Sequence, residues 1–237
     1  MGGAAIAWAQ NAPKSSYYAR VNSFGIFGAY SADSSHMLLG NAENRMLLNI
    51  GVSYGRKLFL NHIVNWQYNG ELLPVALESD PLTRSVIVQT SPTTGTYIYT
   101  GRPPMVTCSP QVNNYSYTFN GVTYSGTDTE TCSGRQWTIG EAISPVGMQW
   151  NFLPRRKLQP FMIGHGGYMY STHPIPTIYG GSFNFTFDLG AGVELYRSRT
   201  KSIRTEYRYH HISNHGTAFV NPGIDNGLFQ VTYSFGH

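Results

Sequence analysis

The sequence predicts an all-β fold, an eight-stranded antiparallel transmembrane β-barrel, and three observations lead to it. Charged residues make up only 12% of the 237-residue chain, about half of what soluble domains carry. No stretch approaches the roughly 18 to 20 apolar residues of a transmembrane helix. Apolar and polar residues alternate over segments of about ten residues, which is typical of outer-membrane strands. A soluble lipocalin-like barrel would alternate with its apolar residues inside, so alternation alone leaves that alternative open.

The N-terminal residues precede the first expected strand. Ala7-Trp8-Ala9 before Gln10 resembles a signal-peptidase site,. We therefore interpret residues 1–14 as a residual signal peptide or N-terminal tail; a tail with no signal function is the alternative. Residues 15–237 are expected to form a single β-barrel domain with a long loop insert at about 76–134.

Strand periodicity recurs along the whole chain. From Phe183 to Leu195 every odd position is apolar, and every even position is polar or Gly. Such alternation places one set of side chains on each face of a strand. The expected strands are about 17–32, 46–54, 58–71, 146–152, 158–171, 183–195, 199–213 and 225–235.

The connections between these strands alternate in length. Short basic turns are expected at 55–57, 154–157 and 197–201, and long loops at about 33–43, 76–134, 172–181 and 214–225. Outer-membrane barrels have short periplasmic turns and long outer loops, which assigns the basic turns to the periplasm. Within 76–134, Asn120-Gly121 predicts a hairpin. A second hairpin between Val86–Gln89 and Tyr97–Tyr99 would allow ten barrel strands.

The two cysteines, Cys108 and Cys132, both lie in the 76–134 segment. In an exported protein this favours a disulfide, with two free thiols as the alternative. The formal net charge is +4. The basic residues form short clusters without aromatic interleaving or a helical basic face, so we expect no nucleic-acid partner.

Strand 199–213 has a charged face. Arg204, Glu206, Arg208 and His210 share one parity. We place this set in the polar lumen, where Glu206 between two arginines can form an ion-pair network. His165 also has lumen parity and is expected to be a packed polar residue.

The opposite face of this strand carries His211 and Ser213 near its end, facing lipid at the rim. Asp225 has the parity of Phe229 on the next strand and so faces outward too. Opposed side chains on neighbouring strands have Cβ atoms about 4.5–5.5 Å apart. A Ser, a His and an acid on one face can form the hydrogen-bonded chain of nucleophilic catalysis. Ordinary polar residues at a rim are the simpler reading, but an acid facing lipid is costly without a function.

The motif His211-Ile212-Ser213-Asn214, with Asn221 eight and Asp225 twelve residues after Ser213, resembles the outer-membrane lipid A 3-O-deacylase (PagL) family of acyloxyacyl hydrolase-like barrels. The resemblance implies Ser213 as nucleophile, His211 as base and Asp225 as orienting acid. It implies Asn221 at the oxyanion hole, with Asn214 in support, and no metal or other cofactor. The implied substrate is the 3-O ester of lipid A in lipopolysaccharide, met among outer-membrane lipids at the outer leaflet of a bacterial outer membrane.

The sequence departs from that family in places. Asp225 stands where the family usually has Glu, and His215 where a small residue is commoner. The 76–134 insert is larger than expected, and the chain ends in Gly236-His237 rather than an aromatic residue. These departures bear more on which ester is cut than on hydrolysis.

Several alternatives stay open on the sequence alone. One is a non-catalytic barrel, adhesin-like or structural, whose cysteine-containing loop binds a partner. Another is a phospholipase or acyltransferase barrel with the same triad. A pore is disfavoured because eight strands leave little open lumen. The acyl chain, the lipid A variant and the oligomeric state, a homodimer included, are not fixed by the residues.

Overall fold

The structure, a computed structural model, describes residues 17–237, so the interpretation of residues 1–14 lies outside the described residues. The strands are β1 (Asn22–Ser31), β2 (Met46–Leu60), β3 (Val64–Ser91), β4 (Gly95–Arg102), β5 (Gln111–Phe119), β6 (Val122–Phe152), β7 (Leu158–Ile175), β8 (Gly181–Tyr196), β9 (Lys201–Ser213) and β10 (Ile224–Gly236). No helix in this described range is long and apolar enough to cross a membrane.

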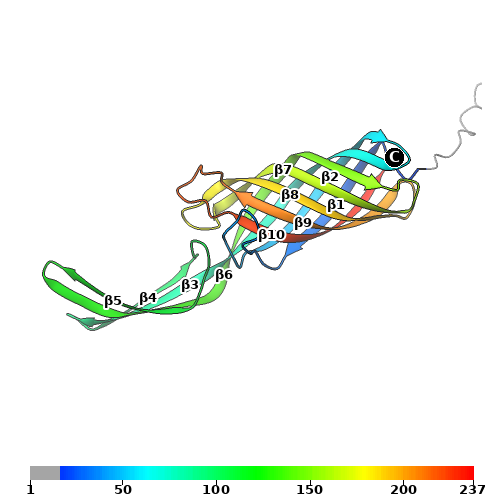
Figure 1. The fold of residues 1–237 in the computed structure, drawn as a ribbon. Coiled ribbons are helices and arrows are strands. Elements are labelled where there is room, and N and C mark those ends of the chain that lie inside the picture. Colours follow the sequence, from blue (N-terminus) through cyan, green and yellow to red (C-terminus); the bar gives the residue numbers. More distant parts are fainter. Residues whose placement is uncertain (1–16) are drawn as a thin grey trace, which may run out of the picture.

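Eight of the strands form a closed antiparallel ring (Figure 1). Its order is β3-β2-β1-β10-β9-β8-β7-β6, and pairing of β3 with β6 closes it. β4 and β5 pair with the outer parts of β3 and β6 and stay outside the ring. The prediction of eight barrel strands is therefore confirmed, and the ten-stranded option is wrong.

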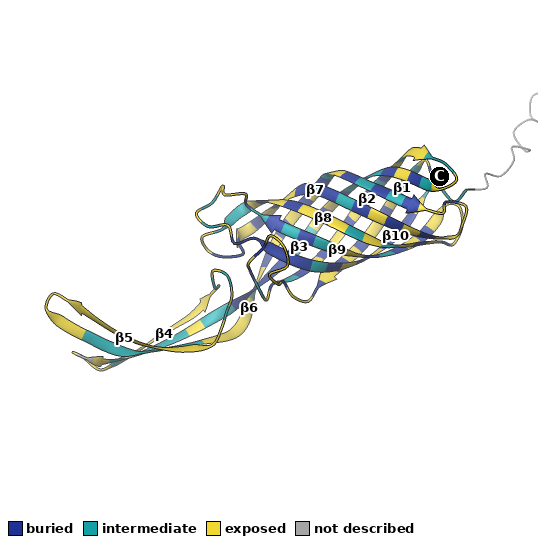
Figure 2. Ribbon diagram, in the orientation of Figure 1, coloured by how far each residue is buried: buried dark blue, intermediate teal, exposed yellow. Residues whose placement is uncertain are grey.

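Buried and exposed residues alternate along the barrel strands, as the sequence pattern predicts (Figure 2). On β9, Arg204, Glu206 and Arg208 are buried inside, while Ile203 and Tyr207 on the other side are exposed. Apolar side chains thus face outward and polar ones face the lumen. This is the opposite of a soluble lipocalin-like barrel, because only a lipid surrounding makes an apolar exterior favourable.

Buried ion pairs fill the lumen. They join Arg208 to Glu71, Glu206 and Asp188, and Arg20 to Glu194. Glu206 pairs with Arg208, whereas Arg204 donates to Gln149 instead. His165 is a packed polar residue as expected, held at 2.8 Å by Asp188 and 3.1 Å by Asn69.

The turn expected at 55–57 is misplaced. β2 continues through Arg56 and Lys57, and the chain reverses only at residues 61–63. The cause is Asn61, whose Oδ1 accepts the N–H groups of Ile63 and Val64, both at 2.8 Å. Such an Asx turn fixes the reversal more strongly than the adjacent basic residues do. The turns near 154–157 and 197–201 lie where they are expected.

The segment at 76–134 is a folded sheet rather than a loop. β3 has 28 residues and β6 has 31, whereas crossing a membrane takes about 9–11. Their outer parts pair with β4 and β5 in the order β4-β3-β6-β5, which we call the outer sheet (Figure 1). Both predicted hairpins form here, and Asn120-Gly121 adopts the positive φ angles of a tight turn, 49° and 78°. Cys108 and Cys132 form a disulfide at the base of the sheet.

Candidate active site

The candidate site lies at the end of the barrel from which the outer sheet projects. β9 ends at Ser213 and β10 begins at Ile224, with His211 directly opposite Asp225 in the register. His211 and Asp225 are fourteen positions apart in the chain, and the antiparallel pairing of β9 with β10 brings them side by side,. His211 Nδ1 lies 2.6 Å from Asp225 Oδ1. The structure therefore brings together the expected base and the expected acid.

Asp225 lies on the outward side of β10, yet its exposed fraction is 0%. The loop between β1 and β2 covers it. The N–H groups of Leu38 and Leu39 donate to Oδ2 at 2.7 and 2.8 Å. The Tyr209 hydroxyl donates to Oδ1 at 2.8 Å. These donors offset the desolvation of a buried carboxylate, which is costly only when its oxygens lack partners.

Two glycines allow the loop between β1 and β2 to approach Asp225 closely. A Cβ on Gly40 would lie 2.6 Å from the backbone nitrogen of Asp225 and 2.9 Å from its Oδ1. Gly223 has a φ of 65° and faces Gly40 across the contact. A side chain at Gly40 would push the loop away, because Cβ contacts under 3.0 Å essentially do not occur, and a side chain at Gly223 would be strained by its positive φ,.

Ser213 has different neighbours. Its hydroxyl lies 3.0 Å from Asn221 Nδ2 and 3.2 Å from Asn221 Oδ1. The N–H of His215 donates to Ser213 Oγ at 3.1 Å. No hydrogen bond joins Ser213 to His211 among the described residues. The two residues share the outward side of β9,.

Asn214 organises the loop between β9 and β10. Its side chain is buried, donates to Val220 O at 2.7 Å and accepts the N–H of Gly216 at 2.9 Å. Its own N–H donates to Asn221 Oδ1 at 3.1 Å. The loop thereby carries Asn221 back to the end of β9, beside Ser213. This supports the placement of Asn214 as a supporting residue rather than a reacting one.

The arrangement offers the parts of an acyl-transfer site. It contains an imidazole fixed by a carboxylate, a hydroxyl on the same side of the strand, and two N–H donors beside that hydroxyl, from His215 and Asn221. Converging donors of this kind can stabilise an oxyanion. Apolar side chains surround the site, with Leu38 73% and Phe219 89% exposed. Exposed apolar groups at a membrane rim suit a lipid substrate.

Sequence reasoning missed three residues that contribute hydrogen bonds to Asp225. Tyr209 shares the parity of His211 two residues away, so the pattern could have identified it. The Leu38 and Leu39 contributions are backbone amides, which any residue type supplies. No side-chain pattern marks them.

Comparisons with known proteins address the family and the fold of the chain. The family model described as lipid A 3-O-deacylase (PagL) matches residues 99–234, more than half of the chain and all of the candidate site residues on β9 and β10. A crystal structure of the outer membrane enzyme PagL is similar, with 12% identity and a TM-score of 0.50, over 90% of this chain and 99% of that one. Neisserial surface protein A is similar with 10% identity and a TM-score of 0.42, over 91% and 97% of the two chains. No curated protein matches the sequence.

Proposed function

The chain belongs to the lipid A 3-O-deacylase (PagL) family, and from this premise we propose how its site carries out the reaction. It is an ester hydrolase of the outer membrane, and its family implies lipid A as the substrate. In our proposal Ser213 is the nucleophile, His211 the general base and Asp225 the acid that orients it. Asn221 and the N–H of His215 stabilise the oxyanion. The contact between His211 and Asp225, at 2.6 Å, is the observation that carries the proposal.

The reaction starts when the Ser213 hydroxyl turns from Asn221 toward His211. As Oγ attacks the carbonyl carbon of the 3-O ester, His211 Nε2 takes the hydroxyl proton. The tetrahedral oxyanion then accepts hydrogen bonds from Asn221 Nδ2 and the His215 N–H. Loss of one such donor typically lowers the rate about 10² to 10³-fold.

The second half completes the hydrolysis. The tetrahedral intermediate collapses, the C–O bond to the sugar breaks, and His211 returns its proton to the leaving 3-hydroxyl. Water deprotonated by His211 then attacks the acyl-Ser213 ester and releases the fatty acid. Throughout, Asp225 accepts the Nδ1–H of His211, which keeps Nε2 directed at the reacting atoms.

The outward position of the site explains how a barrel reaches its substrate. The acyl ester of lipid A lies at the interface of the outer leaflet, and His211 and Ser213 lie on the lipid side of the rim. The lipid thus reaches the site by lateral diffusion, with its acyl chain beside the exposed side chains of Leu38 and Leu39. Extraction of the lipid from the membrane is not required.

The test is mass spectrometry of lipid A from a Gram-negative host that expresses the chain behind a signal peptide. The parent protein should remove one hydroxyacyl chain. Ser213→Ala should fold into the membrane and lower deacylation by at least about 10³-fold. Ser198→Ala, in the turn at the opposite end of the barrel, is the matched control and should stay active. Full activity of Ser213→Ala would refute the assignment, and cleavage of phospholipid alone would favour the phospholipase alternative.

A further inference from the structure

The outer sheet has one tyrosine-rich face. Tyr99 lies opposite Ser85 in the register, and Ser85 lies opposite Glu130, so these three share a face. By the same register this face carries Tyr97, Tyr99, Tyr115, Tyr117 and Tyr124. Tyr97, Tyr99 and Tyr117 are about half exposed, at 46%, 50% and 53%. So many exposed rings on one side of a sheet in water indicate a binding surface rather than a core.

The tyrosine face is hollowed. A groove of about 530 Å³ lies near the base of the sheet and a second of about 480 Å³ lies toward its tip. They adjoin, because both are lined by Ile87 and Tyr99. Asp128 and Glu130 line the first groove, and Tyr115 and Tyr117 line the second. The face therefore offers an extended site with a polar part and an aromatic part.

The rings form a pre-arranged platform. Tyr115 and Tyr117 have centroids 6.2 Å apart, and Tyr117 and Tyr124 stack at 5.2 Å with 11° between their planes. The carboxylates beside them keep acceptor capacity. Asp128 accepts the Ser85 hydroxyl at 2.6 Å, and Glu130 accepts the Gln111 amide at 2.5 Å. Since a carboxylate has about four lone-pair sites, both can accept further hydroxyl donors.

This combination fits a sugar. A pyranose ring has an apolar C–H face that stacks on an aromatic ring and a rim of hydroxyls that donate to carboxylates. Arg102 lines the first groove as well, but Asp128 and Glu130 outnumber it, so the net negative charge there disfavours phosphorylated segments and favours uncharged sugars,. We propose that the tyrosine face binds uncharged sugars of the saccharide that lipid A carries in lipopolysaccharide. This inference rests on the proposed function, because that function places the substrate at the rim.

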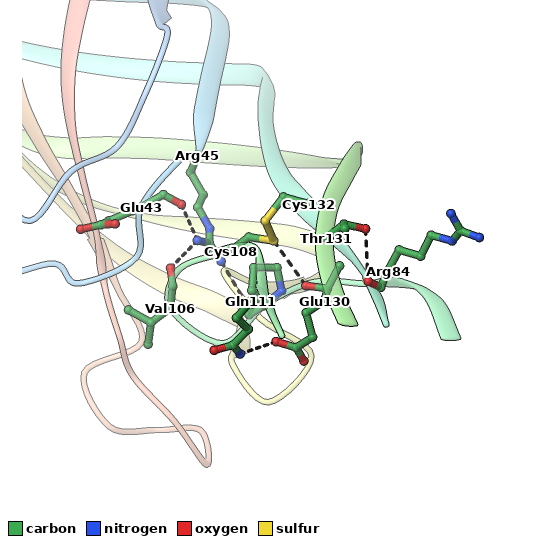
Figure 3. The surroundings of a disulfide bond; sticks show 11 residues. Glu43, Arg45, Arg84, Val106, Cys108, Gln111, Glu130, Thr131 and Cys132 are labelled. Atoms are coloured by element: carbon green, nitrogen blue, oxygen red, sulfur yellow. Dashed lines mark hydrogen bonds between the residues drawn. A yellow bond between two sulfur atoms is a disulfide. The ribbon is translucent and has the colours of Figure 1, made fainter. Parts of the chain in front are cut away.

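The outer sheet is fixed relative to the candidate active site. Arg45 is fully buried and donates to Val106 O and Pro104 O in the segment between β4 and β5. Arg45 also pairs with Asp80 on β3 at 2.9 Å. Figure 3 shows the contact of Arg45 with Val106 beside the disulfide between Cys108 and Cys132. These contacts tie the base of the sheet to the barrel rim.

Arg45 belongs to the same loop as Leu38 and Leu39, whose amides hold Asp225. One loop thus contacts both the base of the outer sheet and the candidate triad. A lipopolysaccharide whose ester lies at Ser213 extends its saccharide outward, at the end of the barrel where the sheet projects (Figure 1). The sheet would hold the sugars while the site holds the lipid.

Binding can be measured without catalysis. The probe is the soluble core oligosaccharide released from lipopolysaccharide, titrated by calorimetry into the detergent-solubilised full chain carrying Ser213→Ala. Adding Tyr99→Ala and Tyr117→Ala should weaken the affinity about tenfold. Adding Ile98→Ala and Thr118→Ala, at neighbouring positions on the opposite face, should leave it unchanged. Absence of binding by the parent, or equal binding by both variants, overturns the proposal without touching the triad assignment.

Kinetics give the second readout. In the otherwise unmutated chain, the double tyrosine variant should raise the KM for lipopolysaccharide about tenfold and leave kcat/KM for lipid A without its saccharide unchanged. Heat-modifiable migration on a gel checks that the barrel is folded. An equal loss on both substrates would show a structural role and overturn the proposal. So would sedimentation showing that the tyrosine face joins two copies of the chain.

Discussion

At the scale of single residues, Asp225 is the most constrained group of the candidate site. Its two oxygens accept hydrogen bonds from His211, Tyr209 and the amides of Leu38 and Leu39. The carboxylate is also fully shielded from solvent. The position therefore selects side-chain length as well as charge, and it suits Asp rather than the longer Glu.

Lengthening this side chain should impair the enzyme. Asp225→Glu moves the carboxylate by about 1.5 Å, against the covering loop, and displaces His211. We expect kcat to fall about 10²-fold, the usual cost of a misplacement of about 1 Å. The measurement is the rate of fatty-acid release from lipid A in detergent. Asp33→Glu, an exposed acid of the same loop, is the control. Parental activity of Asp225→Glu would show that the loop does not restrict the site.

Removing the phenol hydroxyl of Tyr209 should have a smaller effect. Tyr209→Phe deletes a hydrogen bond of 2.8 Å to the oxygen that also accepts from His211. A hydrogen bond to a charged group typically contributes about 1.5–3 kcal/mol to stability. The effect here should be smaller because His211, Leu38 and Leu39 still donate to Asp225. We expect kcat to fall about tenfold with KM unchanged. Tyr207→Phe, on the same side of β9 and 59% exposed, should match the parent protein. A change confined to KM would instead place Tyr209 in substrate binding.

At the scale of elements, the loop between β1 and β2 determines the environment of the candidate site. It runs alongside the start of β10, where Ser35 N–H and Ala42 N–H donate to Asp225 O and Gly223 O. This pairing turns an outward-facing strand end into a buried one. A lipid-side acid thereby becomes tolerable, because protein amides rather than lipid surround it.

The close contact at Gly40 can be tested directly. Gly40→Ala would place a Cβ 2.6 Å from Asp225 N and 2.8 Å from Ile224 C, so the loop must shift. We expect most of the deacylase activity to be lost while the barrel stays intact. Fatty-acid release measures the activity, and heat-modifiable gel migration reports on the barrel. Gly28→Ala on β1 is the control, because its Cβ would meet nothing within 4 Å. Equal activities of the two variants would contradict a role for the loop in holding Asp225.

At the scale of the whole molecule, two strands run through two parts of the protein. β3 and β6 close the barrel and continue beyond it into the outer sheet. The ring is stabilised by its closed hydrogen bonding and its buried lumen ion pairs. The outer sheet lacks such a core and is held by pairing along β3 and β6, by Arg45 and by the disulfide. The two parts should therefore differ in stability.

Removing the disulfide should loosen only the outer sheet. Replacing Cys108 and Cys132 by Ser removes a crosslink with a sequence separation of 24. A disulfide that closes a loop of this length typically contributes about 3 kcal/mol to the free energy of unfolding. We expect faster proteolysis between 92 and 121, while the barrel keeps its heat-modifiable migration. Limited proteolysis with mass mapping measures this, with the double variant Ser198→Ala and Thr200→Ala as control. Unfolding of the barrel together with the sheet would refute the independence of the two parts.

Much of this protein is determined by its sequence. Alternation over about ten residues is a local property, so it predicted the barrel strands, their lumen and lipid sides, and the shared face of His211, Ser213 and Asp225. Other features depended on contacts that only the folded chain creates. The reversal at Asn61 replaced the turn expected at 55–57 because one side chain bonded two amides. The continuation of β3 and β6 followed from long-range pairing, and the cover over Asp225 from backbone donors that leave no side-chain pattern. Periodicity records which side of a strand a residue faces; tertiary structure alone decides what covers that side.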